Sequence, residues 1–303
     1  MKLEGVHHIT AITADGQKNL DFYVGVLGLR LVKKTVNQDN PTIYHLFYAD
    51  EKGSAGADLT FFEFPGAPLG RAGEGMISRI SHRVGSPEAL EFWEKRLGEH
   101  GIETERADDE LRFADPEGLS HALKVVETDD EPLIAKHPEI PEGMALQGFD
   151  GALALSSDPE RSRPLLEETL QFEPLEGGWE ARGEQRGGLW GYAEPTGERG
   201  VQGAGTVHHI AWGSKTEEHE KWRERVIAAG AQPTPVIDRF YFRSVYFREP
   251  SGVLFEIATL GPGFTVDEPL EHLGEKLSLP PDYEHLRDQV EPQLTPLINP
   301  RLK

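Results

Sequence analysis

The chain has 303 residues, of which 37% are hydrophobic, including 14 Phe and 5 Trp; this is typical of a globular protein large enough for two domains. Its 31 basic and 52 acidic residues give a formal net charge of −21, which argues against nucleic acids and anionic membranes as partners because both would be repelled. The absence of cysteine excludes disulfides, thiolate metal sites and a cysteine nucleophile, and it fits a cytoplasmic protein. No apolar run is long enough to cross a bilayer, and a strand pattern follows Met1 directly, so we expect no signal peptide.

The same order of elements occurs four times: a strand, an amphipathic helix, and two or three further strands. The first repeat has strands at 6–13, 29–36, 42–49 and 57–64 with a helix at 17–27. The second has strands at 76–84 and 120–126 with a helix at 87–100; the third has a strand at 149–156, a helix at 160–170, and ends near 192. The fourth has a strand at 206–212, a helix at 216–229, and final strands at 241–247 and 253–258. The sequence therefore predicts an α+β fold of four βαβββ repeats.

Composition divides the chain into four parts. A segment rich in Pro, Glu and Asp, residues 127–145, is predicted to link an N-terminal pair of modules, 1–126, to a C-terminal pair, 146–260. The tail, 261–303, is rich in proline and shows few apolar anchors. We expect the tail to wrap the surface with one or two short helices.

The repeats align best at their ends. Asp115–Gly118 in the second repeat matches Glu249–Gly252 in the fourth, and both have proline and glycine where turns favour them. This alignment places Ala122 opposite Glu256, the single carboxylate in the apolar strand 253–258. A charge on a buried strand costs several kcal/mol unless it is paired or coordinated. Glu256 is therefore predicted to face a metal ion.

Histidine pairs mark the front of the first and fourth repeats: His7 with His8, and His208 with His209. Two imidazoles and one carboxylate are a ligand set for a redox-active divalent metal that keeps positions open for substrate and oxygen. One such pair alone would more often be a polar strand end, but its recurrence together with Glu256 favours a metal site. Strand alternation puts the two histidines of each pair on opposite faces and leaves open which of them binds.

The middle repeats lack this set. His82 aligns with His209, and Gly151 stands where the third repeat would carry a histidine. We therefore expect His82 to be structural. His45, His100, His121 and His219 have no comparable context and are predicted to be solvated or structural.

The four repeats, the HHIT opening at 7–10, the LRLVKKTVN stretch at 29–37, the second VHH and the Glu256 strand resemble the vicinal oxygen chelate superfamily over nearly all of 4–260. Within it, the chain is similar to ring-cleaving dioxygenases that act on hydroquinones. The resemblance implies two open mixed-sheet barrels, with the first and fourth repeats joined in the catalytic one. It also implies that the second histidine of each pair is the ligand, so that His8, His209 and Glu256 bind Fe(II), or alternatively Mn(II), while other divalent metals can occupy the site on purification.

The same resemblance implies a group of residues around the metal. Arg239 would hold a substrate oxyanion, and Tyr246 would act as an acid or base or donate a hydrogen bond. Thr10 shares a strand face with His8, whereas His7 and His208 would reach the site only through a bulge or from behind, as hydrogen-bond partners of the ligands.

The predicted function is metal-dependent, non-haem cleavage of a hydroquinone- or catechol-like ring with O2; a homo-oligomer is left open. One alternative is a glyoxalase-type lyase or isomerase, in which Glu63 would be a fourth ligand. Phe64-Pro65-Gly66 follows Glu63, so we expect this carboxylate to turn into solvent instead. The other alternative is a non-catalytic small-molecule-binding (resistance) protein of the same fold, which would need no metal ligands.

Overall fold

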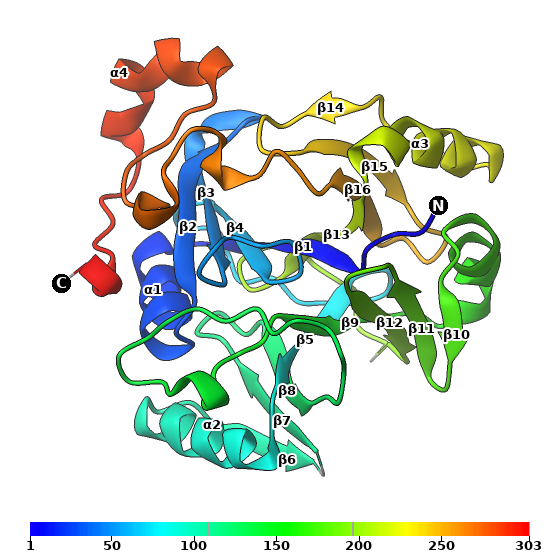
Figure 1. Cartoon of the computed structure of the whole chain (residues 1–303), viewed down its shortest axis with the longest axis horizontal. Coiled ribbons are helices and arrows are strands. Elements are labelled where there is room, and N and C mark those ends of the chain that lie inside the picture. Colours follow the sequence, from blue (N-terminus) through cyan, green and yellow to red (C-terminus); the bar gives the residue numbers. More distant parts are fainter. Residues whose placement is uncertain (108, 196, 303) are drawn as a thin grey trace.

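The computed structural model describes residues 1–107, 109–195 and 197–302. The strands form two eight-stranded mixed sheets, which confirms the predicted fold class. Figure 1 shows how the sheets and helices are arranged. Among the helices of the described residues, none combines the length and apolar character needed to cross a membrane.

The first sheet contains the strands of the first and fourth repeats in the order β14-β15-β16-β13-β1-β4-β3-β2. Its strands are β1 Val6–Thr13, β2 Arg30–Asn37, β3 Asn40–Ala49, β4 Asp58–Glu63, β13 Val207–Ser214, β14 Ile237–Asp238, β15 Arg243–Arg248 and β16 Leu254–Thr259. At its centre β1 and β13 are antiparallel, with Ile9 opposite Ile210. Every residue of β1 is buried, because the sheet curls into a half-barrel whose two faces are both covered. The two ends of the chain therefore meet in one sheet, as the resemblance implied.

The second sheet contains the strands of the middle repeats in the order β10-β11-β12-β9-β5-β8-β7-β6. Its strands are β5 Ile77–Val84, β6 Thr104–Ala107, β7 Glu110–Ala114, β8 Ser120–Val125, β9 Phe149–Leu155, β10 Glu173–Leu175, β11 Gly178–Arg182 and β12 Gly187–Ala193. The predicted boundaries at 126, 145 and 260 stay a prediction.

Pairing in the second sheet corrects the alignment of His82. Ile80 lies opposite Ala152 at the centre, as Ile9 lies opposite Ile210, so Arg79 and Gly151 occupy the positions of His8 and His209. Ala122 pairs with Ser81, two residues after Arg79, just as Glu256 pairs with Ala211, two residues after His209. The equivalence of Ala122 and Glu256 therefore agrees with the strand pairing. His82 does not stand at a ligand position, because matching by residue type moved it three places out of register.

The helices differ from the prediction in their winding. The helix α2, Pro87–Glu99, begins where Ser86 accepts a hydrogen bond from the Ala89 amide. The helix predicted at 17–27 divides into α1, Gly16–Leu20, and a π-helical segment, Asp21–Val26. In the third repeat Pro164 lacks an amide donor, and the predicted helix becomes the 3-10 segment Pro159–Ser162 and the π-helical segment Pro164–Thr169. The fourth repeat has the 3-10 segment Thr216–Glu218 followed by α3, His219–Ala228.

The C-terminal tail is held more firmly than predicted. It lies along β2, orange to red in Figure 1, and contains α4, Arg287–Val290, and several 3-10 segments. The prediction of few apolar anchors was wrong, since five apolar tail residues are buried: Phe264, Leu273, Leu279, Val290 and Leu294. Proline spacing had masked this pattern. Lys33 of β2 is fully buried and forms ion pairs with Asp267 and Glu268 of the tail.

Candidate metal centre

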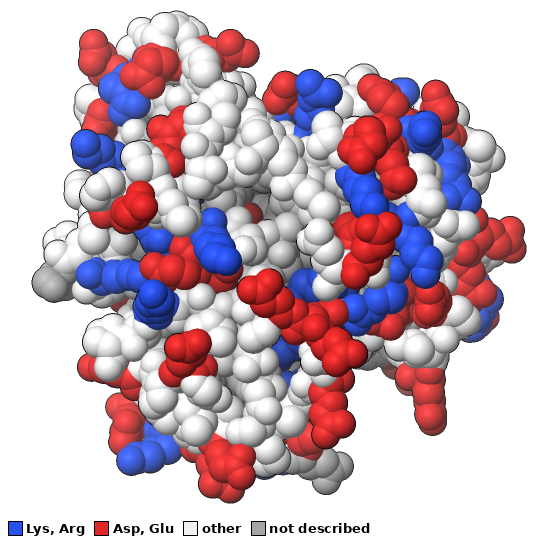
Figure 2. Space-filling model, viewed as in Figure 1, with Lys and Arg blue, Asp and Glu red and all other residues white. Residues whose placement is uncertain are grey.

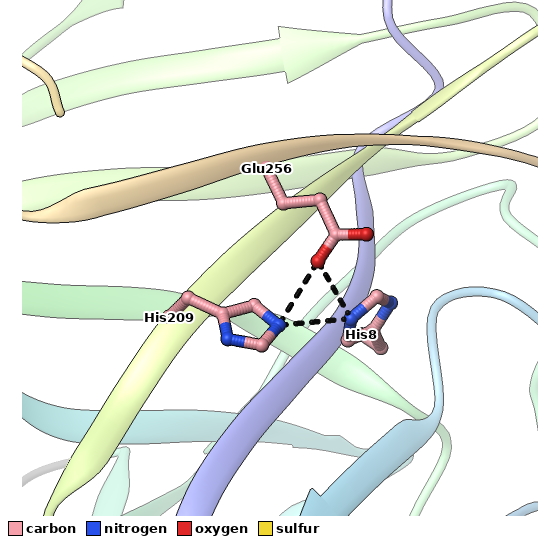
Figure 3. A group of neighbouring side chains, drawn as sticks. All are labelled: His8, His209 and Glu256. Carbon is pink, nitrogen blue, oxygen red and sulfur yellow. Dashed lines mark hydrogen bonds and ion pairs between the residues drawn. The ribbon is translucent and has the colours of Figure 1, made fainter. Parts of the chain in front are cut away.

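Three side chains from neighbouring strands converge on the concave face of the first sheet (Figure 3). They are His8 of β1, His209 of β13 and Glu256 of β16. The two Nε2 atoms lie 3.2 Å apart, and Glu256 Oε2 lies 3.2 Å from His8 Nε2 and 2.9 Å from His209 Nε2. All three residues are buried, and they form the one such cluster found in the described part of the chain. The structure thus brings together the three residues predicted to be ligands.

The other histidine of each pair lies behind its neighbour. His7 Nδ1 is 2.9 Å from His8 Nδ1, and His208 Nδ1 is 2.8 Å from His209 Nδ1. The pairing of β1 with β13 shifts register on both sides of this region, between Val6 and His8 and between Thr10 and Ala11. Each outer histidine is therefore a hydrogen-bond partner of the inner one and leaves the inner Nε2 directed at the cluster.

The hydrogen bonds of His7 determine the tautomer of His8. His7 Nε2 lies 3.1 Å from the carbonyl oxygen of Thr259, which can only accept, so the proton of His7 is on Nε2. Burial lowers the pKa of His7 to about 3, so His7 carries that single proton at neutral pH. Its Nδ1 must then accept from His8 Nδ1–H. In the neutral form of His8, Nε2 then has the lone pair, and it points at Glu256 and His209.

The cluster combines an ionised carboxylate with a neutral imidazole. Burial raises the pKa of Glu256, but His8 and His209 outweigh it and hold that pKa well below its usual range, so the carboxylate is ionised. Burial lowers the pKa of His209, with Glu256 opposing in part, and the imidazole is neutral. Both Glu256 oxygens are buried without an aligned hydrogen bond. The buried carboxylate thus has no aligned donor and lies 2.9–3.2 Å from two imidazole Nε2 atoms, so this donor set fits a divalent metal ion.

A small cavity of about 40 Å³ adjoins the cluster. Its wall is mainly aromatic, which suits a flat ring that stacks against aromatic faces and edges. The lining residues are His8, Thr35, Asn37, Gln38, Asp39, His45, Phe47, Phe62, His209, Arg239, Tyr241, Phe242 and Tyr246.

Tyr246 of β15 stands directly opposite Glu256 of β16, and its ring centroid is 5.6 Å from that of His209. Burial and then the charge of Glu256 raise the pKa of Tyr246 well above its ordinary value, and Arg239 offsets only part of this. The phenol therefore keeps its proton at neutral pH and can donate into the cavity.

Arg239 also lines the cavity, with its guanidinium 5.5 Å from the centroid of the Tyr246 ring. Its two terminal nitrogens lie 3.1 and 2.9 Å from the two carboxylate oxygens of Asp39. No sequence pattern indicates this partner, because Asp39 is 200 positions away and lies in an ordinary turn.

Thr10 is buried at a strand position opposite His209, but it does not line the cavity. Its hydroxyl accepts a hydrogen bond from Thr60, and the Thr60 hydroxyl lies 2.8 Å from His45 Nε2. His45, for which the sequence predicted no site role, is part of the cavity wall. Alternation on β3 could have revealed this only if the face turned toward the metal were already known.

Glu63 does not join the cluster. It alternates with Phe62, which faces the cavity, so it projects from the other face of β4. There its carboxylate accepts from the Gly16 amide at 3.0 Å, at the start of α1. The prediction that Glu63 turns into solvent was wrong: the residue is 2% exposed and is held by the helix start.

His82 of β5 and His121 of β8 belong to a separate buried hydrogen-bond network at the second sheet. His82 Nε2 lies 3.1 Å from His121 Nδ1, and His121 Nε2 lies 3.0 Å from the Tyr23 hydroxyl, which donates to Asp115. Every partner is a protein side chain, so the two histidines have the structural role predicted for them.

Comparison with known proteins agrees with the fold. Residues 5–120 and 148–257 match the family described as the Glyoxalase/Bleomycin resistance protein/Dioxygenase superfamily, and the chain belongs to this superfamily. The resemblance found in the sequence is thereby confirmed.

Two relatives and one solved structure match nearly the whole chain. MhqA of Bacillus subtilis (strain 168), named provisionally as a ring-cleaving dioxygenase, is 41% identical over 319 residues, which cover 98% of this chain and 100% of MhqA. The Chlorohydroquinone/hydroquinone 1,2-dioxygenase of Sphingobium indicum is 30% identical over 310 residues, or 95% of each chain. A crystal structure from Bacillus subtilis subsp. subtilis str. 168, described provisionally as a dioxygenase, has a TM-score of 0.92 at 40% identity and covers 98% of both chains.

Proposed function

We propose that this protein is a metal-dependent dioxygenase that cleaves a hydroquinone- or catechol-like ring with O2. The observation that carries the proposal is the convergence of His8, His209 and Glu256 at 2.9–3.2 Å beside an aromatic cavity. The names of the full-length relatives, including one hydroquinone dioxygenase, support the same reaction.

His8, His209 and Glu256 would hold Fe(II), with Mn(II) as the alternative, in a two-histidine, one-carboxylate arrangement. When bound, such an ion supplies a Lewis acid that favours an ionised phenol, and coordination positions for substrate and O2. Three protein ligands, rather than four or more, leave room for both. His7 and His208 contact the two imidazoles from behind, and the proton on His7 Nε2 fixes the His8 tautomer that presents Nε2.

The remaining cavity residues position the ring and its protons. The aromatic side chains of Phe62 and Phe242 would hold the ring plane and exclude water. Tyr246, which stays protonated, would donate its phenolic proton to a developing negative charge. Arg239 has five donors and uses two on Asp39, so the others can meet a substrate hydroxyl oxygen.

The position of Glu63 favours this proposal over a glyoxalase-type lyase or isomerase. Such a site would need a fourth protein ligand, and Glu63 binds the Gly16 amide on the opposite face of β4. A sequestering protein without chemistry would have no need to bury a carboxylate 2.9–3.2 Å from two imidazole nitrogens.

Oxygen uptake by protein reconstituted with Fe(II) without air, then mixed with hydroquinone or catechol and O2, tests the proposal. We expect uptake of one O2 per ring and incorporation of both oxygen atoms into the product. Glu256→Gln should abolish uptake, whereas the matched control Glu63→Gln, also a buried carboxylate of the first sheet, should retain it. Product formation without O2, or equal loss in both variants, would reject the dioxygenase assignment.

A further inference from the structure

Asp39 occupies an unusual place for an exposed acidic residue. It lies in the tight turn between β2 and β3, its side chain is 74% exposed, and it lines the open side of the cavity beside the metal cluster. Acidic side chains are spread over the face in Figure 2, so exposure alone would give Asp39 no special role. Its contacts do.

The turn that carries Asp39 is fixed on three sides. The Asp39 amide donates to Asn37 Oδ1 at 2.8 Å. Gln38 donates through Nε2 to the carbonyl oxygen of Arg239 at 2.8 Å, and the carbonyl of Gln38 accepts from the hydroxyl of Tyr283 in the tail at 2.8 Å. The Asp39 carboxylate is therefore held at the cavity mouth.

Both oxygens of that carboxylate bind the guanidinium of Arg239, at 3.1 and 2.9 Å. Arg239 is the only Lys or Arg among the described residues that line the cavity. The charge that could attract an anionic ring substituent is thus already balanced. Glu256 beneath it would be balanced by the metal that it holds.

These contacts bear on which charge a substrate ring can carry. A ring without a charged substituent meets aromatic walls, the hydroxyl of Tyr246 and the spare donors of Arg239. A ring with a carboxylate must instead compete with Asp39 for Arg239 and approach its negative charge. We propose that Asp39 selects by charge, so that the site accepts uncharged hydroquinone-type rings and disfavours rings with an anionic substituent. This inference rests on the proposed function and names the substrate class of that site.

The test compares two rings of nearly equal shape and different charge: 2,5-dihydroxybenzamide, which is neutral, and 2,5-dihydroxybenzoate, which is anionic. Each is titrated without oxygen into the Mn(II)-loaded protein, and the dissociation constant is measured by calorimetry. The wild type should bind the amide more tightly. Asp39→Asn should reduce this preference about three- to fivefold, as expected for removing one mostly exposed charge, and Asp39→Glu should keep it.

Asp238→Asn is the matched control. Asp238 lies beside Arg239 in sequence, its side chain is 69% exposed, and its nearest cation is Arg243 at 4.0 Å rather than Arg239. As Asn it can still accept the hydrogen bond from the Phe240 amide. It should leave the preference within about twofold of wild type, and the effect of Asp39→Asn should shrink as salt is raised.

Equal affinity of the wild type for both rings would overturn the inference. An unchanged preference in Asp39→Asn, or an equal change in Asp238→Asn, would overturn it as well. In those cases rings still bind, and the proposed function stands. If neither ring binds to the metal-loaded wild type, the proposed function fails together with the inference.

Discussion

His7 offers a direct way to perturb the cluster without touching a ligand. It connects the Thr259 carbonyl to His8 through two hydrogen bonds of 3.1 and 2.9 Å, and it is 6% exposed. His7→Leu has a similar volume and removes both nitrogens. The His8 Nδ1 proton then has no acceptor, and the tautomer that presents Nε2 to the metal is no longer favoured.

The expected losses of metal affinity and stability follow from the burial of the hydrogen bonds that join Thr259, His7 and His8. Removing a hydrogen-bond partner from behind a metal-binding histidine typically lowers metal affinity about 10- to 100-fold, or about 1.4–2.7 kcal/mol. The buried Thr259 carbonyl also loses its partner, so the metal-free protein should lose about 1–3 kcal/mol of unfolding free energy. His208→Leu removes the equivalent partner of His209, but His208 is exposed, and water can replace it. We expect its affinity loss to be below about tenfold.

The assay is titration with Mn(II), with free ion followed by electron paramagnetic resonance, and urea unfolding of the metal-free proteins. The reasoning predicts a larger loss of affinity for His7→Leu than for His208→Leu. Wild-type affinity in His7→Leu, or the reverse order of the two variants, would refute the proposed proton arrangement.

Three further predictions concern stability and proton donation. Asp58 is 1% exposed, and neither of its carboxylate oxygens has a hydrogen-bond partner among the described residues. Burial, and then the charge of Asp50, raises the pKa of Asp58 well above 3.8. The folded state therefore holds a proton that the unfolded state releases. Stability should fall by up to about 1.4 kcal/mol per pH unit as pH rises from about 4 to the raised pKa, and urea unfolding of Asp58→Asn should show a flatter profile; an unchanged profile would contradict this. Lys33→Met takes the buried ammonium away from the partly exposed Asp267 and Glu268 and should cost about 1–3 kcal/mol of unfolding free energy. Lys95→Met, in an exposed pair, should change it by less than about 1 kcal/mol; similar losses in both would show that the tail is not held by this ion pair. Tyr246→Phe should lower the rate of oxygen uptake about 100-fold while Mn(II) binding stays within twofold; equal rates would remove the phenol from proton donation.

The sequence predicts those parts of the fold that occur in more than one repeat. The matched turns at Asp115–Gly118 and Glu249–Gly252 gave the equivalence of Ala122 and Glu256, with which the strand pairing agrees. The same approach misplaced His82, because a shared residue type is a weaker guide than the pairing of neighbouring strands. Gly151 shows why the third repeat has no ligand: a Cβ there would lie 2.1 Å from the carbonyl oxygen of Leu189.

Contacts between segments that are distant in the sequence could not be predicted from its pattern. Alternation left open which histidine of each pair faces inward, and the outcome depends on register shifts in β1 that have no local signature. Asp39 meets Arg239 only because the two ends of the chain share one sheet. The buried anchors of the tail, such as Phe264, are spaced by prolines and follow neither helix nor strand periodicity.

The central claim is that His8, His209 and Glu256 hold one divalent cation. The most direct measurement is anaerobic equilibrium dialysis of the wild type and Glu256→Gln against Fe(II), followed by metal analysis of each chain. The account predicts one iron per wild-type chain and affinity at least about 100-fold weaker in the variant, since a buried charged ligand is lost. Iron bound at equal affinity and stoichiometry by both proteins would contradict it.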